Sequence, residues 1–442
     1  MNDTIAALAS GRIPAGVAVI RISGPHAFSI VDKLTDVECL SQSPSTARVT
    51  KLYTLLDRNL VDQALRLVFM APRSFTGEDV VELHVHGGLV VIDEVLELLY
   101  SAGARPANPG EFSERAFING KLDLTQAEAI ADIIAAPTRS ARQLAASQLG
   151  GQLTHRIHAV EQHIQSARVL VEASIDFPED VGEVDVEILG RIVDVAVSDL
   201  EQLQKTALRG HLVRNGASVV LVGSPNVGKS SLLNAIAGRD RAIVSPIAGT
   251  TRDTIDVQID LGGIPITLTD TAGLRESKDE IEQIGIDRTH NSIQHADVVL
   301  LLSSDDTPPV SMPKIHTDSR TIHVRTKADL SLAHPGQPDV HVVSAMTGEG
   351  IDLLIQAIVT HLLDETGASS DDTVAINARH SALIMLAIDA LHRVITASNA
   401  HIPADLIAVE LHDAAFHLAN ISGRNVIDAM HQEIFSRFCI GK

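Results

Sequence analysis

The stretch GSPNVGKSS at residues 223–231 follows directly on the apolar run VVLV at residues 219–222. It fits the phosphate-binding pattern G-x-x-x-x-G-K-[ST], which requires a strand before it and a helix after it. Its glycines let backbone N–H groups curl around phosphates, and the N-terminus of the helix adds positive potential. We expect Lys229 to reach the β- and γ-phosphates and Ser230 to ligate Mg²⁺. A chance glycine turn is the alternative, and the strand and helix patterns on either side disfavour it.

Two further segments lie downstream at distances typical of nucleotide switches. DTAG at residues 270–273 follows the strand-like run at residues 264–269, so we expect Asp270 to hold the Mg²⁺ shell and the Gly273 N–H to sense the γ-phosphate. Between the two motifs lies IAGTTRD at residues 247–253, in which Thr251 is the candidate second Mg²⁺ ligand. Either segment alone could be a polar loop. Behind a phosphate-binding loop they indicate a Ras-like α/β domain with two switches.

Two short motifs near the end of this region are expected to read the base. TKAD at residues 326–329 provides Asp329, whose carboxylate can accept hydrogen bonds from guanine N1–H and the exocyclic amine, a pair that adenine lacks. SAMTG at residues 344–348 supplies a backbone N–H for guanine O6. Either motif alone could be a solvated turn, but together and in this order they favour GTP over ATP. The predicted nucleotide-binding residues are Asn226, Val227, Gly228, Lys229, Ser230, Ser231, Ser245, Pro246, Ile247, Ala248, Gly249, Thr250, Thr251, Asp270, Thr271, Ala272, Gly273, Thr326, Lys327, Asp329, Ser344, Ala345 and Met346.

The residue after the second switch glycine departs from the Ras pattern. Ras-like proteins have a Gln there that orients the attacking water, whereas this chain has Leu274, which neither donates nor accepts a hydrogen bond. Another group must therefore position the water. Glu282, in the acidic stretch DEIE at residues 279–282, is a candidate, although its spacing alone favours a solvated helix start.

The regions on either side of this domain have different patterns. Residues 17–22 (VAVIRI) and 80–85 are β-branched runs that predict strands, and residues 89–99 have helical apolar spacing. Beyond residue 120, Thr125 stands three residues before Glu128, which is the spacing of a helix capping box. The sequence thus predicts an N-terminal α+β domain followed by helices.

A long helical seam follows the capping box. Its apolar positions step by four and three and end at Phe177-Pro178; they are Leu153, Ile157, Val160, Ile164, Ala167 and Val171. Helical patterns resume after the small polar stretch at residues 368–372. We predict an α+β domain at residues 1–118 and an all-α domain at 119–213 and 368–442, which is interrupted by an inserted GTPase domain at 214–367.

Composition limits the classes of partner. The net charge is −21 and aromatic residues make up 2% of the chain, so any RNA contact must use a local basic patch or a partner subunit, and base-stacking platforms are disfavoured.

The two cysteines suggest a reducing compartment. An uninterrupted apolar run of about 18 residues and a signal-like N-terminus are both lacking in the sequence, which predicts a cytoplasmic protein outside the membrane.

Several segments resemble one known family over nearly the whole chain. They are VIRISG at residues 19–24, FTGEDVVELHVHGG at 75–88, PGEFSERAFINGKLDLTQAEAIADII at 109–134, the nucleotide motifs, and the terminal FCIGK at 438–442. The chain resembles the bacterial tRNA modification GTPases of the MnmE (TrmE) family. Other GTPase families lack the two flanking signatures, so the combination is specific.

The resemblance implies an activity and a set of partners. Such a protein, with a flavin-containing MnmG-like subunit, adds an aminomethyl-type (carboxymethylaminomethyl) group to C5 of wobble uridine 34 of certain tRNAs. The one-carbon unit comes from a tetrahydrofolate derivative, 5-formyl- or 5,10-methylene-tetrahydrofolate. The N-terminal domain binds the folate and makes a homodimer, the two proteins form a heterotetramer, and GTP with K⁺ closes the GTPase domains on each other.

The resemblance also assigns residues. Asn226 matches the potassium ligand, with Ser245, Ile247 and Thr250 completing the shell, and the Mg²⁺ ligands are Ser230 and Thr251. Glu282 matches the water-orienting switch residue and joins Lys229 as catalytic. Folate-contacting positions correspond to Arg21, Glu82, Lys121 and Lys442. Two departures stand out: Thr326 replaces the usual Asn of the guanine motif, and GRIPAG at residues 11–16 is less glycine-rich than the family pattern.

Other interpretations remain open. A switch or ribosome-assembly GTPase without RNA chemistry of its own would share the nucleotide motifs but would not need the N-terminal and C-terminal signatures. His84 and His86, two apart on a predicted strand, could share a face as metal ligands do. A third ligand is not evident, which favours packing or pocket polarity for both.

Overall fold

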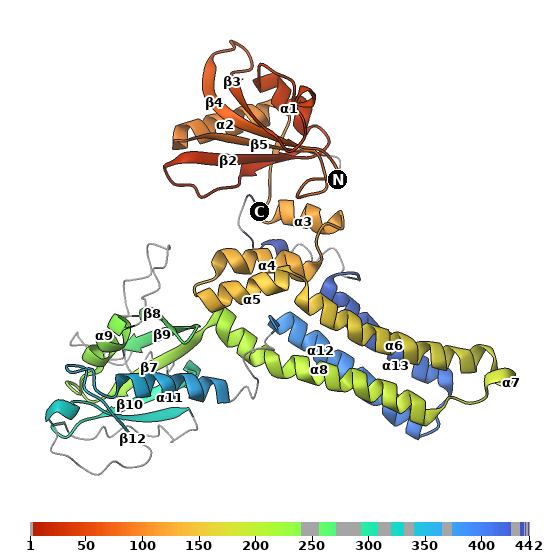
Figure 1. The fold of residues 1–442 in the computed structure, drawn as a ribbon, viewed down its shortest axis with the longest axis vertical. Helices are drawn as coiled ribbons and strands as arrows, with labels where there is room; N and C mark the ends of the chain where they lie inside the picture. The colour runs from red at the N-terminus through yellow and green to blue at the C-terminus, as the bar shows by residue number, and fades with distance from the viewer. Residues whose placement is uncertain are drawn as a thin grey trace, which may run out of the picture. The chain divides into compact units, whose positions relative to one another are not determined.

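The computed structural model describes residues 3–239, 256–270, 293–307, 320–330, 340–364, 374–425, 434–436, 438 and 441. The chain forms two compact units, one from Met1–Ala131 with Ala419–Lys442 and one from Asp132–Leu418 (Figure 1). Each unit is described by itself below.

The first unit is built on a six-stranded sheet with strand order β3-β4-β5-β2-β1-β6. All neighbouring strands are antiparallel except β1 and β6, which are parallel. The predicted strands at residues 17–22 and 80–85 are confirmed within β2 and β5. The strands are β1 (Ile5–Leu8), β2 (Ala15–Ser23), β3 (Ala47–Tyr53), β4 (Leu60–Phe69), β5 (Val80–Gly87) and β6 (Arg105–Pro106).

Alternation along the strands turns one face of this sheet to the main core. The opposite face, which we call the polar face because it carries Arg21 and Glu82, also holds a small apolar cluster around Phe112 that includes Ile5 and Ala7. Ile20 and Ile22 of β2 are fully buried in a core with α1 (Ala27–Leu34) and α2 (Leu89–Ala102), which confirms the helix predicted at residues 89–99. Cys39, at the start of a 3₁₀ turn (Cys39–Ser41), lies in the same core, where burial raises the pKa of its thiol. Arg21 lies between Ile20 and Ile22 and therefore faces the other side of the sheet.

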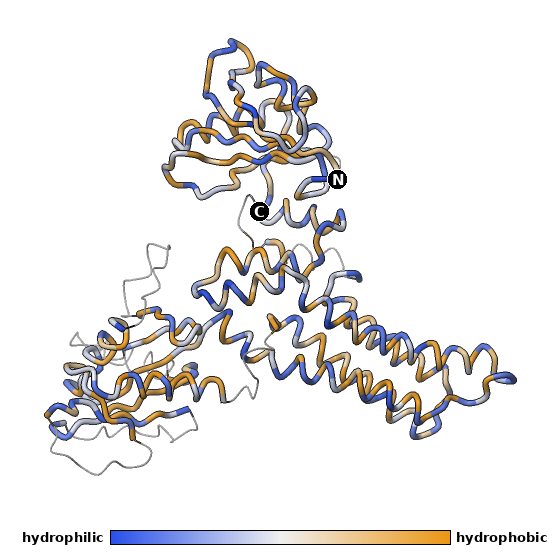
Figure 2. The backbone as a smooth tube through the Cα atoms, in the orientation of Figure 1, coloured by the Kyte–Doolittle hydropathy of each residue, from blue (hydrophilic) through white to orange (hydrophobic). Residues whose placement is uncertain are grey.

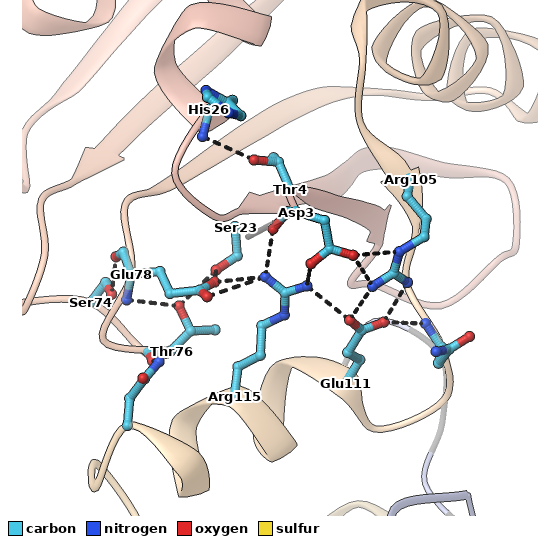
Figure 3. A network of polar contacts seen from close by, with 12 residues as sticks. Asp3, Thr4, Ser23, His26, Ser74, Thr76, Glu78, Arg105, Glu111 and Arg115 are labelled. Atoms are coloured by element: carbon cyan, nitrogen blue, oxygen red, sulfur yellow. Dashed lines mark hydrogen bonds and ion pairs between the residues drawn. The ribbon is translucent and has the colours of Figure 1, made fainter. Parts of the chain in front are cut away.

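A network of ion pairs around the buried Arg115 attaches α3 (Glu111–Ile118) to the start of the chain (Figure 3). Arg115 is 1% exposed, and its guanidinium contacts Asp3 at 2.8 Å, Glu111 at 2.9 Å and Glu78 at 3.1 Å. Arg105 bridges Asp3 and Glu111, at 2.7 and 2.6 Å. Removing one partner of such a network leaves a buried charge uncompensated, so the network specifies where α3 docks.

This network predicts a pH dependence of stability. Burial raises the pKa of Glu111, but hydrogen bonds from Arg105, Asn108 N–H and Arg115 outweigh it and leave the pKa below its ordinary 4.5. The pKa of Asp3 is lowered in the same way by its arginine partners. A carboxyl with a lowered folded pKa contributes stability that is present above its unfolded pKa and is lost as pH falls through the folded value. We therefore expect protection of α3 to fall once pH drops below about 4.5.

The measurement is hydrogen exchange of α3 peptides between pH 7 and pH 3, corrected for intrinsic rates. In the Glu111→Gln variant, the α3 amides are expected to be less protected from exchange at pH 7 than in the unmodified chain. Their protection should also fall less as the pH is lowered. Glu114 is the matched control, because burial and the neighbouring Glu111 raise its pKa. Glu114→Gln should therefore increase the protection of α3 at neutral pH, whereas Glu111→Gln should decrease it. Equal slopes in all three chains would contradict the role given to Glu111.

The start of α4 (Leu124–Ala135) corrects one prediction. The Asp123 carboxylate accepts the Gln126 N–H at 2.8 Å, and the Gln126 side chain accepts the Asp123 N–H at 3.0 Å. The capping box is therefore formed by Asp123 and Gln126, two residues before the predicted Thr125 and Glu128. Thr125 lies inside the first turn, where its hydroxyl donates to Asp123 at 2.7 Å. Asp is as good an N-cap residue as Thr, and in the structure Asp123 takes this role instead of Thr125.

The C-terminal segment packs on the first unit. Phe435 and Phe438 join a cluster with Leu124 and the partly buried Phe117. Gly441 has a φ of +92°, and a Cβ there would lie 2.0 Å from the Leu8 carbonyl oxygen, so the backbone approaches β1 more closely than any other residue permits. This contact brings the end of the chain to the strand that pairs with Arg21 of β2 through Ala7.

The second unit contains a set of long helices. α6 is the predicted seam, with all six of its apolar positions buried, and it ends at Asp176 before Phe177 as expected. α6 and α12 both pack against α8. Hydrophilic and hydrophobic residues alternate along these helices, as they do in helices with one buried face (Figure 2). The helices are α5 (Arg139–Leu149), α6 (Gln152–Asp176), α7 (Pro178–Val181), α8 (Val186–Asn215), α12 (Ala378–Asn399) and α13 (Ala404–Ser422).

One helix in the described part of the chain, α12, is long and apolar enough to cross a membrane by length and composition. It also carries Arg379, Asp389 and Arg393. Its apolar face, which includes the fully buried Ile384 and Leu391, packs in the helical layer beside α8. A helix of a helical domain can have the same composition, so this feature alone is weak evidence for a membrane span.

The second unit also contains a six-stranded α/β sheet with order β12-β11-β10-β7-β9-β8. Neighbouring strands are parallel, except that β8 is an antiparallel edge strand. Helices α9 (Lys229–Arg239) and α11 (Ile351–Asp364) pack on it, and a 3₁₀ turn, η3 (Ala328–Leu330), follows β11. The strands are β7 (Ala217–Gly223), β8 (Asp256–Leu261), β9 (Ile264–Asp270), β10 (Val298–Ser303), β11 (Thr321–Arg325) and β12 (Val340–Val342).

Helix α8 continues into β7 with a single residue between them. Gly216 has a φ of +82°, and a Cβ there would lie 2.1 Å from the Pro265 carbonyl oxygen on β9. The start of β9 also receives a hydrogen bond from the Thr138 hydroxyl to the Gly263 carbonyl, at 3.0 Å. The sheet is thereby attached at one end to the helices, and the other end of β9 carries Asp270.

Candidate functional site

The predicted nucleotide motifs follow the carboxyl ends of neighbouring parallel strands. The phosphate-binding loop follows β7, Asp270 ends β9, TKAD follows β11 and SAMTG follows β12. In open α/β sheets this edge is where ligands bind. The structure therefore brings together the four motifs, which span more than a hundred residues of sequence.

The loop between β7 and α9 has the backbone that a phosphate cradle requires. Asn226 adopts φ +62° and Gly228 φ +101°, both in the left-handed half of conformational space. Lys229 is 6% exposed, and its ammonium donates to the carbonyl oxygens of Gly223 and Ser224, each at 2.9 Å. The lysine is thus folded over the loop, where a phosphate oxygen can replace a carbonyl as acceptor.

Two groups expected around Mg²⁺ already touch each other. The Ser230 hydroxyl donates to the Asp270 carboxylate at 2.6 Å, and Asp270 is 1% exposed at the end of β9. Register fixes this meeting, because Asp270 pairs with Leu221 of β7, the strand that precedes the loop. Oxygen donors of this kind suit a hard cation such as Mg²⁺.

Thr326 braces the phosphate-binding loop. Its side chain is 5% exposed, and its hydroxyl donates to the Val227 carbonyl at 2.5 Å, with the Ser303 carbonyl at 3.2 Å as the other acceptor nearby. A hydroxyl has one hydrogen to give. The single donor of Thr326 is therefore used on the loop, and it leaves no donor for a purine.

This geometry predicts that Thr326→Asn tightens GDP and GTP binding. An Asn side chain carries two N–H donors and an oxygen, so it can keep the Val227 contact and add one to the base. A hydrogen bond of this kind contributes about 0.5–1.5 kcal/mol net, which is roughly a few-fold to tenfold in affinity. Stopped-flow binding of a fluorescent GDP analogue measures the change. Unchanged or weaker affinity would show that the larger Asn disturbs the packing without reaching the base.

Thr326→Val is the matched control, because it keeps the branched shape and deletes the hydroxyl. It removes the brace on Val227 and should weaken binding of the same analogue.

The base-reading motifs are linked by a direct hydrogen bond. Ser344 is fully buried, and its hydroxyl donates to the Asp329 carboxylate at 2.5 Å. Asp329 itself is exposed, in η3, so its outer face is open to a base. Lys327 adopts φ +61°, and its ammonium pairs with Asp306 at 2.6 Å. Ala345 and Met346 follow Ser344 in the loop, and Met346 is 89% exposed.

The structure adds one residue that the sequence did not single out. Arg239, the last residue of α9, donates to the Gly348 carbonyl at 2.8 Å and forms an ion pair with Asp352. It thus connects the helix after the phosphate-binding loop to the SAMTG loop. Arg239 precedes Gly348 and Asp352 by more than a hundred residues and belongs to none of the motifs named from the sequence, so no sequence signal identifies the pairing.

Several predicted site residues lie outside the described residues. Among them are the switch residue Glu282 and the terminal Lys442, and Leu274, which stands in place of the usual Gln, is not described either. The remainder are nucleotide-contacting or metal positions: Ser245, Pro246, Ile247, Ala248, Gly249, Thr250, Thr251, Thr271, Ala272 and Gly273. Their assignments stay predictions.

A second polar site lies on the polar face of the first sheet. The Arg21 guanidinium pairs with the Glu82 carboxylate at 2.8 Å, across the β2–β5 register that sets these residues opposite each other. Both side chains are 17% exposed. The guanidinium also lies 5.2 Å from the ring centroid of Phe75 and 5.6 Å from that of Phe112. This is a planar donor–acceptor pair whose guanidinium contacts two aromatic rings.

The other predicted folate positions belong to the same unit. Lys121 donates to the Pro72 carbonyl at 3.0 Å, on the loop that carries Phe75. Lys442 is not described, but the preceding Gly441 packs on Leu8, next to Ala9.

The histidines of β5 have carboxylate neighbours. His84 Nε2 lies 3.5 Å from Glu82, and His86 Nδ1 lies 2.6 Å from Asp62. No group of three or more His, Cys, Asp or Glu side chains with metal-binding geometry occurs among the described residues. The contacts fit the polar role favoured from the sequence.

Comparisons with known proteins cover the chain from end to end. Residues 4–121 match the family model of the GTP-binding protein TrmE N-terminus, and residues 124–439 match that of the MnmE helical domain. The tRNA modification GTPase MnmE of Carboxydothermus hydrogenoformans is 38% identical over 463 residues, 100% of each chain. That of Prochlorococcus marinus is 40% identical over 464 residues, 100% of this chain and 98% of its own.

Among solved structures, the G domain of the T. maritima FeoB iron transporter aligns with 33% of this chain and 98% of its own at 28% identity. Its TM-score of 0.25 is too low to support an argument about the fold.

Proposed function

The chain belongs to the MnmE family of tRNA modification GTPases, and within that role we propose a potassium-stimulated GTP hydrolase that acts on the wobble uridine of tRNA. With a flavin-containing partner it adds a carboxymethylaminomethyl-type group to C5 of uridine 34, using a one-carbon unit of a tetrahydrofolate derivative. The observation that carries this proposal is the presence in one chain of two sites: the nucleotide edge with its Ser230–Asp270 pair, and the Arg21–Glu82 pair with two rings at the guanidinium.

The proposed domain organisation is an α/β GTPase domain at residues 214–367 inserted into a helical domain formed by residues 119–213 and 368–442, with an α+β domain at 1–118. The packing of α12 on α8 supports it, since these helices lie on either side of the α/β sheet in the sequence. The two family matches also meet between residues 121 and 124.

In the proposed hydrolysis, Lys229 moves from the loop carbonyls to the β- and γ-phosphates, and the loop N–H groups bind the phosphate oxygens. Ser230 and Thr251 would ligate Mg²⁺ and Asp270 would help to hold it, and the ion would supply positive charge next to the phosphate oxygens. Asn226, Ser245, Ile247 and Thr250 would hold K⁺. Glu282 orients the attacking water, a role that Leu274 cannot fill. Asp329 selects guanine.

In the proposed folate site, Arg21 and Glu82 present one donor edge and one acceptor edge side by side. A planar heterocycle with adjacent hydrogen-bonding groups fits such a pair. Lys121 and Lys442 add positive charge for the carboxylates of a folate tail. A bound tetrahydrofolate derivative would supply the one-carbon unit.

The proposed assembly is a homodimer that joins a flavin-containing, MnmG-like subunit in a heterotetramer in the cytoplasm. The net charge of −21 supports a partner that shares the tRNA contact, because phosphate neutralisation needs basic surface.

Nucleoside analysis of total tRNA from a deletion strain tests the proposal. Loss of the modified wobble uridine, restored by the wild-type chain but not by a Lys229→Ala chain, is the expected result. An unchanged nucleoside profile together with accumulating ribosomal precursors would favour the alternative, a ribosome-assembly GTPase.

A further inference from the structure

The loop at residues 72–79 brings Phe75 next to Arg21, whose guanidinium lies 5.2 Å from the centroid of the Phe75 ring. Its own side chains fix its shape, because the Ser74 hydroxyl donates to the Glu78 carbonyl at 2.5 Å. The loop is also bound to the residue that follows helix α3, because the Asn119 side chain donates to the Thr76 carbonyl at 2.7 Å. The position of the Phe75 ring therefore depends on how this loop is anchored.

Glu78 is the charged anchor of the loop. One oxygen of its carboxylate accepts the Ser23 hydroxyl at 2.7 Å, and Arg115 lies at 3.1 Å from the same oxygen (Figure 3). The Glu78 side chain is 15% exposed and that of Arg115 is 1% exposed. Ser23 is two residues beyond Arg21 on β2 and faces the same side. Glu78 thus joins the loop, β2 and α3 at one point.

Each residue of the Glu78–Arg115 ion pair lies on the same segment as one of the two rings that contact Arg21. Phe75 precedes Glu78 by three residues on the loop, and Phe112 precedes Arg115 by three residues on α3. Residues three apart in a helix lie on one side, one turn apart. The Glu78–Arg115 pair therefore ties together the segments that carry the two rings.

We propose that Glu78 and Arg115 are positioning residues for Arg21. Their ion pair fixes Phe75 and Phe112 on the Arg21 guanidinium, and this holds Arg21 and Glu82 in the orientation that binds the planar ring of a reduced folate. The inference rests on the folate site proposed above and assigns two residues that do not themselves contact the ligand.

The test uses the full chain and 5-formyltetrahydrofolate in titration calorimetry. Glu78→Gln is expected to weaken binding by about tenfold or more, in the range seen when a group that orients a ligand-binding residue is removed. GTP turnover is the internal reference, because it depends on the other unit and should not change. Arg115→Lys is the second variant, since an ammonium cannot span Asp3, Glu78 and Glu111 as the guanidinium does.

Asp3→Asn is the matched control. Asp3 belongs to the same ion-pair network and contacts Arg105 and Arg115, but no hydrogen bond joins it to the loop at residues 72–79 in the described part of the chain. It should lower protection of α3 while leaving folate affinity within about twofold. Wild-type affinity in Glu78→Gln, or equal loss in Glu78→Gln and Asp3→Asn, would reduce the pair to a purely structural role and overturn the proposal.

A second readout does not need folate. In a chain labelled with ¹⁵N-arginine, the Arg21 Nε–H signal, identified as the one missing in Arg21→Lys, should move in Glu78→Gln and stay in place in Asp3→Asn. Ring currents of Phe75 and Phe112 make this signal sensitive to their placement. If the unmodified chain binds no folate, the proposed folate function fails, while this shift still decides whether Glu78 positions Arg21; an unmoved signal refutes the positioning role.

Discussion

Asp329→Asn is expected to turn the nucleotide preference of the chain from GTP to xanthosine triphosphate, with the ratio of the two specificities changing on the order of 10²–10⁴-fold. The carboxylate of Asp329 reads two donors of guanine. An amide presents an N–H instead, which pairs with the second carbonyl of xanthine and meets the exocyclic amine of guanine with a like donor. A mismatch of buried polar groups is what makes such discrimination large.

The Ser344 contact makes the substitution interpretable. Ser344 donates to one oxygen of Asp329, and the amide oxygen that the substitution introduces can still accept that bond, so the side chain keeps its direction. Hydrolysis of GTP and of xanthosine triphosphate is measured in competition. Ser344→Ala is the control: it frees the carboxylate to turn and should weaken both nucleotides without reversing the preference. A variant chain that still prefers GTP shows that Asp329 does not read the base.

The nucleotide edge could be predicted from sequence because its parts are local. The strand before residues 223–231 and the helix after it are each short patterns, and a parallel sheet brings the ends of its strands to one edge whatever their spacing in sequence. Side-chain contacts across that edge could not be predicted. The hydrogen bonds of Ser230 with Asp270 and of Thr326 with Val227 depend on strand register and on rotamers, which a linear pattern does not contain.

The second site shows the same limit more sharply. Alternation along β2 and β5 places Arg21 and Glu82 on one face of each strand, but only the pairing register sets them opposite each other. Their selection from sequence came from family resemblance. The anchor formed by Glu78 and Arg115 was not expected, because Arg115 is a buried charge on a helix whose apolar pattern is weak. The misplaced capping box at α4 is a smaller case, in which Asp123 and Thr125 are both acceptable caps and the sequence pattern alone does not choose between them.

Hydrolysis is expected to be faster in potassium than in sodium at matched ionic strength, by about tenfold or more. An arginine finger that neutralises charge on the phosphates contributes 10³–10⁵ in kcat, and a cation bound at the same place does comparable work. Two observations motivate the expectation. Leu274 stands where Ras-like proteins have Gln, so the sequence lacks that group at this position. Asn226 lies in the phosphate-binding loop with an exposed side chain and a left-handed backbone.

The backbone of Asn226 dictates the design of the test. Asn226→Ala removes the amide oxygen, but Ala adopts a left-handed backbone less readily than Asn does. At φ +62°, a loss of activity could therefore come from a strained loop. Asn226→Gly removes the same oxygen and adopts that φ without strain. Both variants should lose the difference between the two salts and still bind GTP, and the Gly variant should bind it more tightly than the Ala variant. Turnover in sodium equal to that in potassium for the unmodified chain would exclude the cation from the mechanism. A difference that survives in Asn226→Gly would place its ligands elsewhere in the loop, because no side-chain oxygen remains at residue 226 to bind the ion.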